Sequence, residues 1–175
     1  MPCPLCQEPT ANIPTATTMT FEVQCPNCGQ FCLTLAARHD LNGQVAIAFD
    51  LASWVYGQNL LGGAPKIDSA TIDFIKTLPH PSTRKRAELY LGRIIRMLDG
   101  KLLGRFEPAD ARLRVASWSY SNEDSCAIAD YLAELGAVKP PTIGTMYSLV
   151  AKGHVIYDEM TVQRIVSSQA FIDVV

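Results

Sequence analysis

Four cysteines near the start of the chain have the types and spacing of a metal site. They form two C-x-x-C pairs, Cys3 with Cys6 and Cys25 with Cys28, and 18 residues separate the pairs. Two such pairs at this separation are typical of a tetrahedral zinc site with four thiolate ligands. Four thiolates fill that shell and leave no position for a catalytic water. We therefore expect a structural Zn²⁺, with redox or iron chemistry as the alternative.

The residues around the second pair alternate as in a β-hairpin. Phe21 and Val23 share one side of the first strand, and the apolar period returns on a second strand as far as Leu35. The pair itself then lies in the turn, where Gly29 tolerates a positive φ. So short a segment cannot bury enough surface to fold alone, so the metal should supply much of its folding free energy. The sequence predicts a zinc ribbon over residues 1–36.

The composition and the N-terminus limit the class of protein and the compartment in which these cysteines could bind a metal. The chain has 175 residues, of which 48% are apolar and 18% charged, so it can form a packed core. No apolar run approaches the length of about 18 residues that a membrane span needs. The N-terminus also lacks the charged start and apolar stretch of an export signal. Because paired cysteines without export indicate a reducing compartment, we expect a cytoplasmic protein.

The elements after the ribbon are predicted to be helical over residues 37–104. Apolar side chains recur at helical spacing over residues 44–59, 68–77 and 82–99. The third stretch has the most continuous apolar stripe, and Gly100 is a natural end for it. The ribbon is expected to be a brace or a docking face beside the predicted winged helix.

A basic stretch coincides with the third helix and continues beyond it. Residues 82–114 hold nine basic and four acidic side chains, whereas no Lys or Arg precedes Arg38. Because phosphate binding requires cations, the ribbon is not expected to bind nucleic acid. The simplest interpretation of the basic stretch is a solvated helix face, and contact with phosphate or with an acidic protein surface are the alternatives. The candidate contact residues are Arg84, Lys85, Arg86, Arg93, Arg96, Lys101, Arg105, Arg112 and Arg114.

Residues 105–164 are predicted to form a winged helix. Helical patterns over residues 109–117 and 121–135 precede two short strands, one at residues 137–138 and one at residues 146–150, and a final helix begins at Ala151. In such folds the helix before the wing usually enters the major groove of DNA. Here that helix carries four carboxylates and no Lys or Arg, which opposes contact with phosphates. The charges therefore favour a protein contact.

The order of these parts resembles a group of bacterial proteins. The resemblance rests on the two C-P-x-C motifs, on Ala116–Ser119 before the long helix, and on Leu149–Gly153 at the start of the last helix. In that group a zinc ribbon, a helical segment and a winged helix precede an effector domain of TIR-like or nucleoside-deoxyribosyltransferase-like type. The resemblance implies a sensing or regulatory role, of the kind found in defence against phage. It also implies that residues 168–172 open a strand of the next domain, within a tail at residues 165–175.

The sequence as a whole predicts an α+β protein made of a ribbon, a helical middle and a winged helix. It contains no H-E-x-x-H or G-x-S-x-G motif, and Gly63 stands where a phosphate loop would need lysine. The leading hypothesis is a non-enzymatic regulatory, sensor or adaptor module that contacts a protein partner or an attached effector domain. The alternative is a winged-helix transcription regulator that binds DNA through residues 84–114. A homodimer remains open, and no membrane contact is expected.

Overall fold

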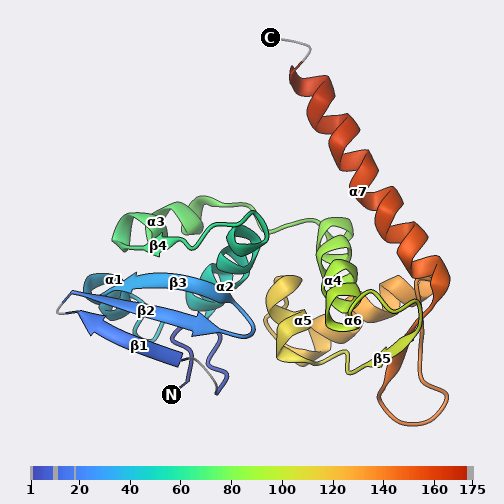
Figure 1. The fold of residues 1–175 in the computed structure, drawn as a ribbon, viewed down its shortest axis with the longest axis horizontal. Coiled ribbons are helices and arrows are strands. Elements are labelled where there is room, and N and C mark those ends of the chain that lie inside the picture. The colour runs from blue at the N-terminus through green and yellow to red at the C-terminus, as the bar shows by residue number, and fades with distance from the viewer. Residues whose placement is uncertain (1, 10–11, 18, 173–175) are drawn as a thin grey trace.

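The computed structural model describes residues 2–9, 12–17 and 19–172, with the backbone alone for residues 12–17 and 163–172. The architecture is α+β, as expected. Figure 1 shows two packed units, an N-terminal sheet with its helices beside a C-terminal group of helices with a small sheet. No helix in the described part of the chain is long and apolar enough to cross a membrane.

The N-terminal unit is built on a mixed four-stranded sheet. The predicted hairpin is confirmed as strands β2 (Thr20–Cys25) and β3 (Gly29–Thr34), which pair antiparallel. Strand β1 (Asn12–Thr17) pairs antiparallel with β2, and β4 (Lys66–Ile67) pairs parallel with β3. The sheet order is therefore β1-β2-β3-β4, so the hairpin lies at its centre.

One residue of the predicted hairpin belongs to a different element. Leu35 was expected at the end of the second strand, but it begins helix α1 (Leu35–Asp40) and half of its surface is exposed. The physical reason is a helix cap, because the Thr34 hydroxyl accepts a hydrogen bond from the Ala37 N–H. Because of this cap the strand ends at Thr34, although the alternating apolar pattern continues to Leu35.

Three helices follow and agree with the predicted ones. They are α2 (Val45–Leu60), α3 (Ser69–Thr77) and α4 (Thr83–Met97). Asp68 caps α3 by accepting the Thr71 N–H, as its position before the helix indicated. Helix α2 packs on β3 and α3, whereas α4 packs on helices that come later in the chain.

The C-terminal unit combines four helices with a three-stranded antiparallel sheet. After α4 the chain forms β5 (Gly104–Phe106), α5 (Ala111–Ala116), α6 (Asn122–Glu134), β6 (Val138–Lys139) and β7 (Tyr147–Leu149). Strand β7 lies between β5 and β6 in the sheet. The long helix α7 (Ala151–Ile172) begins beside α4 and leads away from it in Figure 1.

The expected strand over residues 168–172 is wrong, because these residues continue helix α7. A short apolar run such as residues 170–172 is compatible with a strand or with a helix, so the sequence alone could not decide between them. The structure therefore gives no beginning of a further sheet within the described residues.

Two hydrophobic cores divide the described residues differently from the predicted segments at 1–36, 37–104 and 105–164. The first core joins the sheet to α1, α2 and α3, and the second joins α4 to α6, the small sheet and α7. Helix α5 contributes to both, because Val115 and Ala116 lie in the first core and Leu113 in the second. The helical middle is thus shared between two units, and α5 ties them together.

Candidate metal centre

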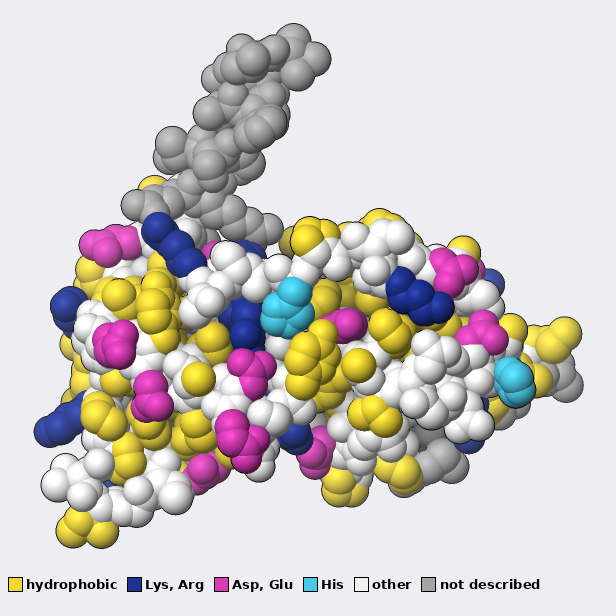
Figure 2. Space-filling model, turned by 180° about the vertical axis from the view of Figure 1, so that it is seen from behind, with side chains coloured by type: hydrophobic (Ala, Val, Ile, Leu, Met, Phe, Trp, Pro, Cys, Tyr) yellow, Lys and Arg dark blue, Asp and Glu magenta, His cyan; other side chains and the backbone are white. Residues whose placement is uncertain are grey.

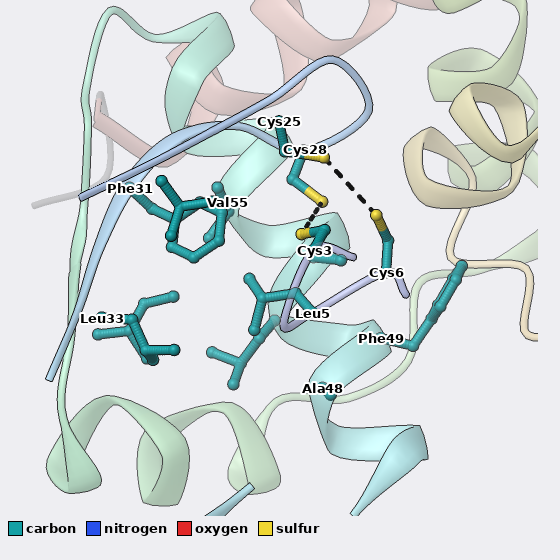
Figure 3. Close-up of a cluster of buried hydrophobic side chains, with 14 of the residues drawn as sticks. Cys3, Leu5, Cys6, Cys25, Cys28, Phe31, Leu33, Ala48, Phe49 and Val55 are labelled. Atoms are coloured by element: carbon teal, nitrogen blue, oxygen red, sulfur yellow. Dashed lines mark hydrogen bonds between the residues drawn. The ribbon is translucent and has the colours of Figure 1, made fainter. Parts of the chain in front are cut away.

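The four predicted ligands converge inside the N-terminal unit. Their Sγ atoms all lie within 4.8 Å of one another, with 3.9 Å between Cys3 and Cys28 and 3.7 Å between Cys6 and Cys25. Figure 3 shows these side chains pointing toward one another at the edge of the apolar core. Sulfurs placed about 2.3 Å from one zinc ion at tetrahedral angles lie about 3.8 Å apart, so the spacing fits a shared ion. The sulfurs are too far apart for disulfides, whose bond is about 2.0 Å long.

A tight turn of residues 3–8, the first knuckle, presents the first pair. The Cys3 N–H donates to the Glu8 carbonyl, and the Gln7 N–H donates to the Cys3 carbonyl, each over 3.0 Å. Gln7 has φ +63°, a conformation that few residues other than glycine adopt. Leu5 is fully buried between the two cysteines and anchors the turn in the core. The backbone is thereby bent so that both thiols face inward.

A second turn, residues 25–29 (the second knuckle), presents the other pair and is held by helix α2. Gly29 has φ +96°, as the sequence predicted, and Asn59 lies directly over it. The Asn59 side chain accepts the Gln30 N–H and donates to the Gln30 carbonyl, both over 2.9 Å. Sequence reasoning missed Asn59, because an asparagine near the end of an apolar helix has no pattern that predicts this contact.

The four thiols shift one another's pKa values because they are buried close together. A hydrogen bond with Cys25 is the main cause that raises the pKa of Cys3 and of Cys28, whereas hydrogen bonding with Cys28 lowers the pKa of Cys25. Some of the sulfurs therefore keep their protons when no cation is near. A divalent ion has to displace those protons, so metal binding at this site should release protons into solution.

The two remaining cysteines lie outside the cluster. Cys32 is a half-buried residue of β3, and Cys126 is a half-buried residue of α6. Burial raises the pKa of Cys126, so its thiol is a poor nucleophile at neutral pH. No other group of three or more metal-binding side chains occurs among the described residues.

Several of the predicted phosphate-contact residues are instead bound within the chain. Arg86 is the clearest case, since only 12% of its side chain is exposed. Its guanidinium donates to the Ser117 carbonyl over 2.8 Å and to the Asp124 carboxylate over 2.6 Å. Arg86 therefore joins α4 to the start of α6 and is not presented to a ligand.

Three more arginines reach across to the N-terminal unit. Arg114 of α5 pairs with Glu8 over 3.0 Å, and Arg93 of α4 donates to the Pro26 carbonyl over 3.0 Å. Arg96 donates to the Tyr56 hydroxyl over 2.8 Å. The Arg93 guanidinium also lies over the Tyr56 ring, 4.8 Å from its centre. Two of these contacts end on the knuckles that carry the cysteines.

The other five candidates do not form one continuous basic surface. Lys85 pairs with Glu88 and Arg112 with Asp110, each over 2.6 Å. Figure 2 shows basic and acidic side chains interspersed over the face that it presents. The three candidates outside these two pairs are all exposed: Arg84, Lys101 and Arg105.

The outward face of α6 is acidic, as the sequence predicted. Glu123, Asp130 and Glu134 are exposed on this helix. Asp130 accepts a hydrogen bond from the Tyr147 hydroxyl, which raises the pKa of Tyr147 to about 12. Tyr147 is the first residue of β7, so the hydrogen bond joins α6 to the small sheet.

A cavity of about 260 Å³ lies beside the candidate metal centre. Its lining combines the first knuckle with the sheet face and the connection between α1 and α2. Cys3 forms part of the wall, and Arg38, which stacks over the Phe21 ring at 4.8 Å, forms part of the rim.

Comparison with known proteins found no relative of this chain. No family model, curated protein or solved structure matches the chain. The functional interpretation therefore depends on the four clustered cysteines, which could hold a metal ion, and on the contacts of the arginines around them.

Proposed function

We propose that the protein is a non-enzymatic regulatory module in which a structural Zn²⁺ holds the N-terminal unit beside a protein-binding winged helix. The observation that carries this proposal is that the half-buried arginines bind groups within the chain. Arg86, Arg93 and Arg114 bind groups of the chain itself, so they are not a cationic surface for nucleic acid. What remains exposed on α6 is acidic, which suits a basic protein surface better than a phosphate backbone.

A structural role for the ion is supported by the ligand set. Thiolates are soft ligands that Zn²⁺ accepts in a tetrahedron, and four of them leave no open coordination position. All four cysteines are buried, which limits access of water or substrate to the ion. When bound, the ion would supply folding free energy to a small sheet and would not take part in a reaction.

The order of the C-terminal elements supports the winged helix. Two helices, α5 and α6, lie between β5 and the strand pair β6 and β7, and the central strand of the sheet is β7. The turn between β6 and β7 would be the wing, with Ile143 95% exposed near its tip. Helix α6 then occupies the place of the helix that reads DNA in other proteins, but its carboxylates favour a protein partner.

The metal part of the proposal is tested by elemental analysis of the purified protein. We expect about one zinc per chain, and we expect Cys25→Ser to lose the metal together with the folded N-terminal unit, as read by circular dichroism. Cys32→Ser is the matched control, because Cys32 lies outside the cluster, and it should keep its zinc. Zinc well below half an equivalent in the wild type, with Cys25→Ser still folded, would contradict the proposal.

The alternative function, DNA binding, is favoured by one observation, the exposure of Arg84, Lys101 and Arg105. Fluorescence anisotropy with a labelled mixed-sequence duplex at about 50 and 200 mM salt separates the two functions. The protein-contact proposal expects no salt-dependent binding. Binding that weakens steeply with salt, and is lost when these three residues are replaced by alanine, would establish the alternative.

We further propose that the module acts in a sensing role, with a separate protein or an attached effector domain as its partner. The resemblance to bacterial sensor proteins supports this setting, and the acidic face of α6 offers a surface for the contact. Pull-down with the purified protein and with a Glu123→Lys, Glu134→Lys variant would identify partners that depend on this face. Partners that bind both proteins equally would place the contact elsewhere. Light scattering would report whether the protein forms a homodimer.

A further inference from the structure

We infer that Arg93 and Arg114 are part of the metal centre, where they balance the negative charge of the metal and its four thiolates. The inference rests on the zinc site of the proposed function and deepens it. It makes the C-terminal unit a contributor to metal binding, although all four ligands lie in the N-terminal unit. It also gives metal occupancy a route to the contact between the two units.

The charge of the site shows why outside cations are needed. Four thiolates around Zn²⁺ carry a formal charge of about −2, and Glu8 adds another negative charge at the end of the first knuckle. The chain before Arg38 holds no Lys or Arg, so the N-terminal segment supplies no compensating cation. Burying uncompensated charge is costly, so positive charge from elsewhere in the chain would stabilise the loaded site.

The two arginines bring positive charge to both knuckles. Arg114 pairs with Glu8, two residues after Cys6, and 20% of the Arg114 side chain is exposed. Arg93 donates to the carbonyl of Pro26, which directly follows Cys25. One guanidinium therefore reaches each knuckle, and the two come from different helices of the C-terminal unit, α4 and α5.

The Nε–H groups of these same arginines lack hydrogen-bond acceptors of their own in the described part of the chain. Both Nε atoms are buried and have no hydrogen-bond acceptor among the described residues. Arg112, two residues from Arg114 on α5, instead uses both its Nε and its Nη2 on Asp110. A buried N–H without an acceptor is unfavourable, and the field of a nearby anionic centre reduces that cost.

Metal occupancy should consequently affect how firmly the two units are joined. With the metal lost, no ion links the two knuckles, so the Pro26 carbonyl and the Glu8 carboxylate are held less firmly in place for the two guanidiniums. The contacts of Arg93 and Arg114 then lose part of their stabilisation. The C-terminal unit would sense the metal through α4 and α5, without any ligand of its own.

Zinc affinity, measured by competition with a chromophoric chelator, tests the inference. We expect Arg93→Gln and Arg114→Gln each to weaken zinc binding by about tenfold, as loss of residues that support metal ligands commonly does. Arg112→Gln makes the same change of charge on the same helix as Arg114→Gln and should stay within about twofold of the wild type. Unchanged affinity in both test variants would overturn the inference.

A second substitution separates charge balance from simple bracing. Glu8→Gln breaks the ion pair with Arg114 but also removes a negative charge near the thiolates. Charge balance predicts that zinc affinity is kept or rises in this variant, whereas a purely structural brace predicts a loss similar to that of Arg114→Gln. A loss of affinity in Glu8→Gln equal to that of Arg114→Gln would therefore overturn the inference.

The outcomes for the two proposals are distinct. A wild-type chain that binds no zinc would overturn the proposed metal site itself. A wild type that binds one zinc tightly, with affinity unaltered in the two arginine variants, would overturn only the inference. If circular dichroism shows that a glutamine variant does not fold, the corresponding lysine variant, Arg93→Lys or Arg114→Lys, takes its place in the assay. These variants keep the positive charge. Charge balance expects these lysine variants to retain affinity within about threefold.

Discussion

At the scale of single residues, Gly29 shows how closely the second knuckle and helix α2 are packed. A Cβ on this glycine would lie 2.5 Å from the Asn59 side chain, and its φ of +96° is unfavourable for other residues. Asn59 in turn satisfies both backbone groups of Gln30. The turn that presents Cys25 and Cys28 therefore depends on a residue about thirty positions later in the chain.

Substitution of this glycine should be more harmful than its small volume suggests. We expect Gly29→Ala to lower the free energy of unfolding by about 2 kcal/mol or more, because it adds both backbone strain and a clash. Gly57→Ala is the control, since Gly57 lies inside α2 with open space around it, and it should stabilise the protein by about 0.5–1 kcal/mol. Denaturant unfolding in the presence of zinc would measure both, and equal effects would contradict this account of the knuckle.

At the scale of elements, those with strong local patterns were predictable. The cysteine hairpin and helices α2, α3, α4 and α6 follow from apolar periodicity and capping residues that lie within each element. Strand β4 could not be foreseen, because two residues carry no pattern and become a strand only by pairing with β3. The roles of the arginines were hidden for a similar reason, since a sequence shows how many charges a segment has but not which groups they meet.

Helix α5 offers a test of the shared core at this scale. Leu113 is fully buried in the second core, so Leu113→Ala should cost about 2–5 kcal/mol and increase hydrogen exchange in α4 and α6. Val115 is fully buried in the first core, so Val115→Ala should have a smaller effect that falls mainly on α2. Hydrogen exchange resolved by peptide would distinguish them. If both variants loosen the same helices, Leu113 and Val115 do not belong to two distinct cores.

At the scale of the whole molecule, we expect the two units to differ in their dependence on metal. The first core includes the four cysteines, whereas the second consists of helix and sheet side chains and no candidate ligand. Removal of zinc by a strong chelator should therefore abolish amide protection in β2 and β3 first. Protection in α4 and α6 should persist, and re-addition of zinc should restore the lost protection. Loss of protection in both units at equal rates would show that they unfold as one.

The ion pair between Glu8 and Arg114 joins residues 106 positions apart, and this separation has a consequence for how the protein is made. During synthesis the four cysteines emerge long before α5, so the thiolate site can capture its metal while Arg114 is still being translated. Contacts between distant residues require closure of a long loop, which makes them late events in folding. If Arg93 and Arg114 balance the charge of the metal centre as proposed, the newborn chain would pass through a stage in which the metal is held without them. Completion of α5 would then add the contact of Arg114 with the first knuckle.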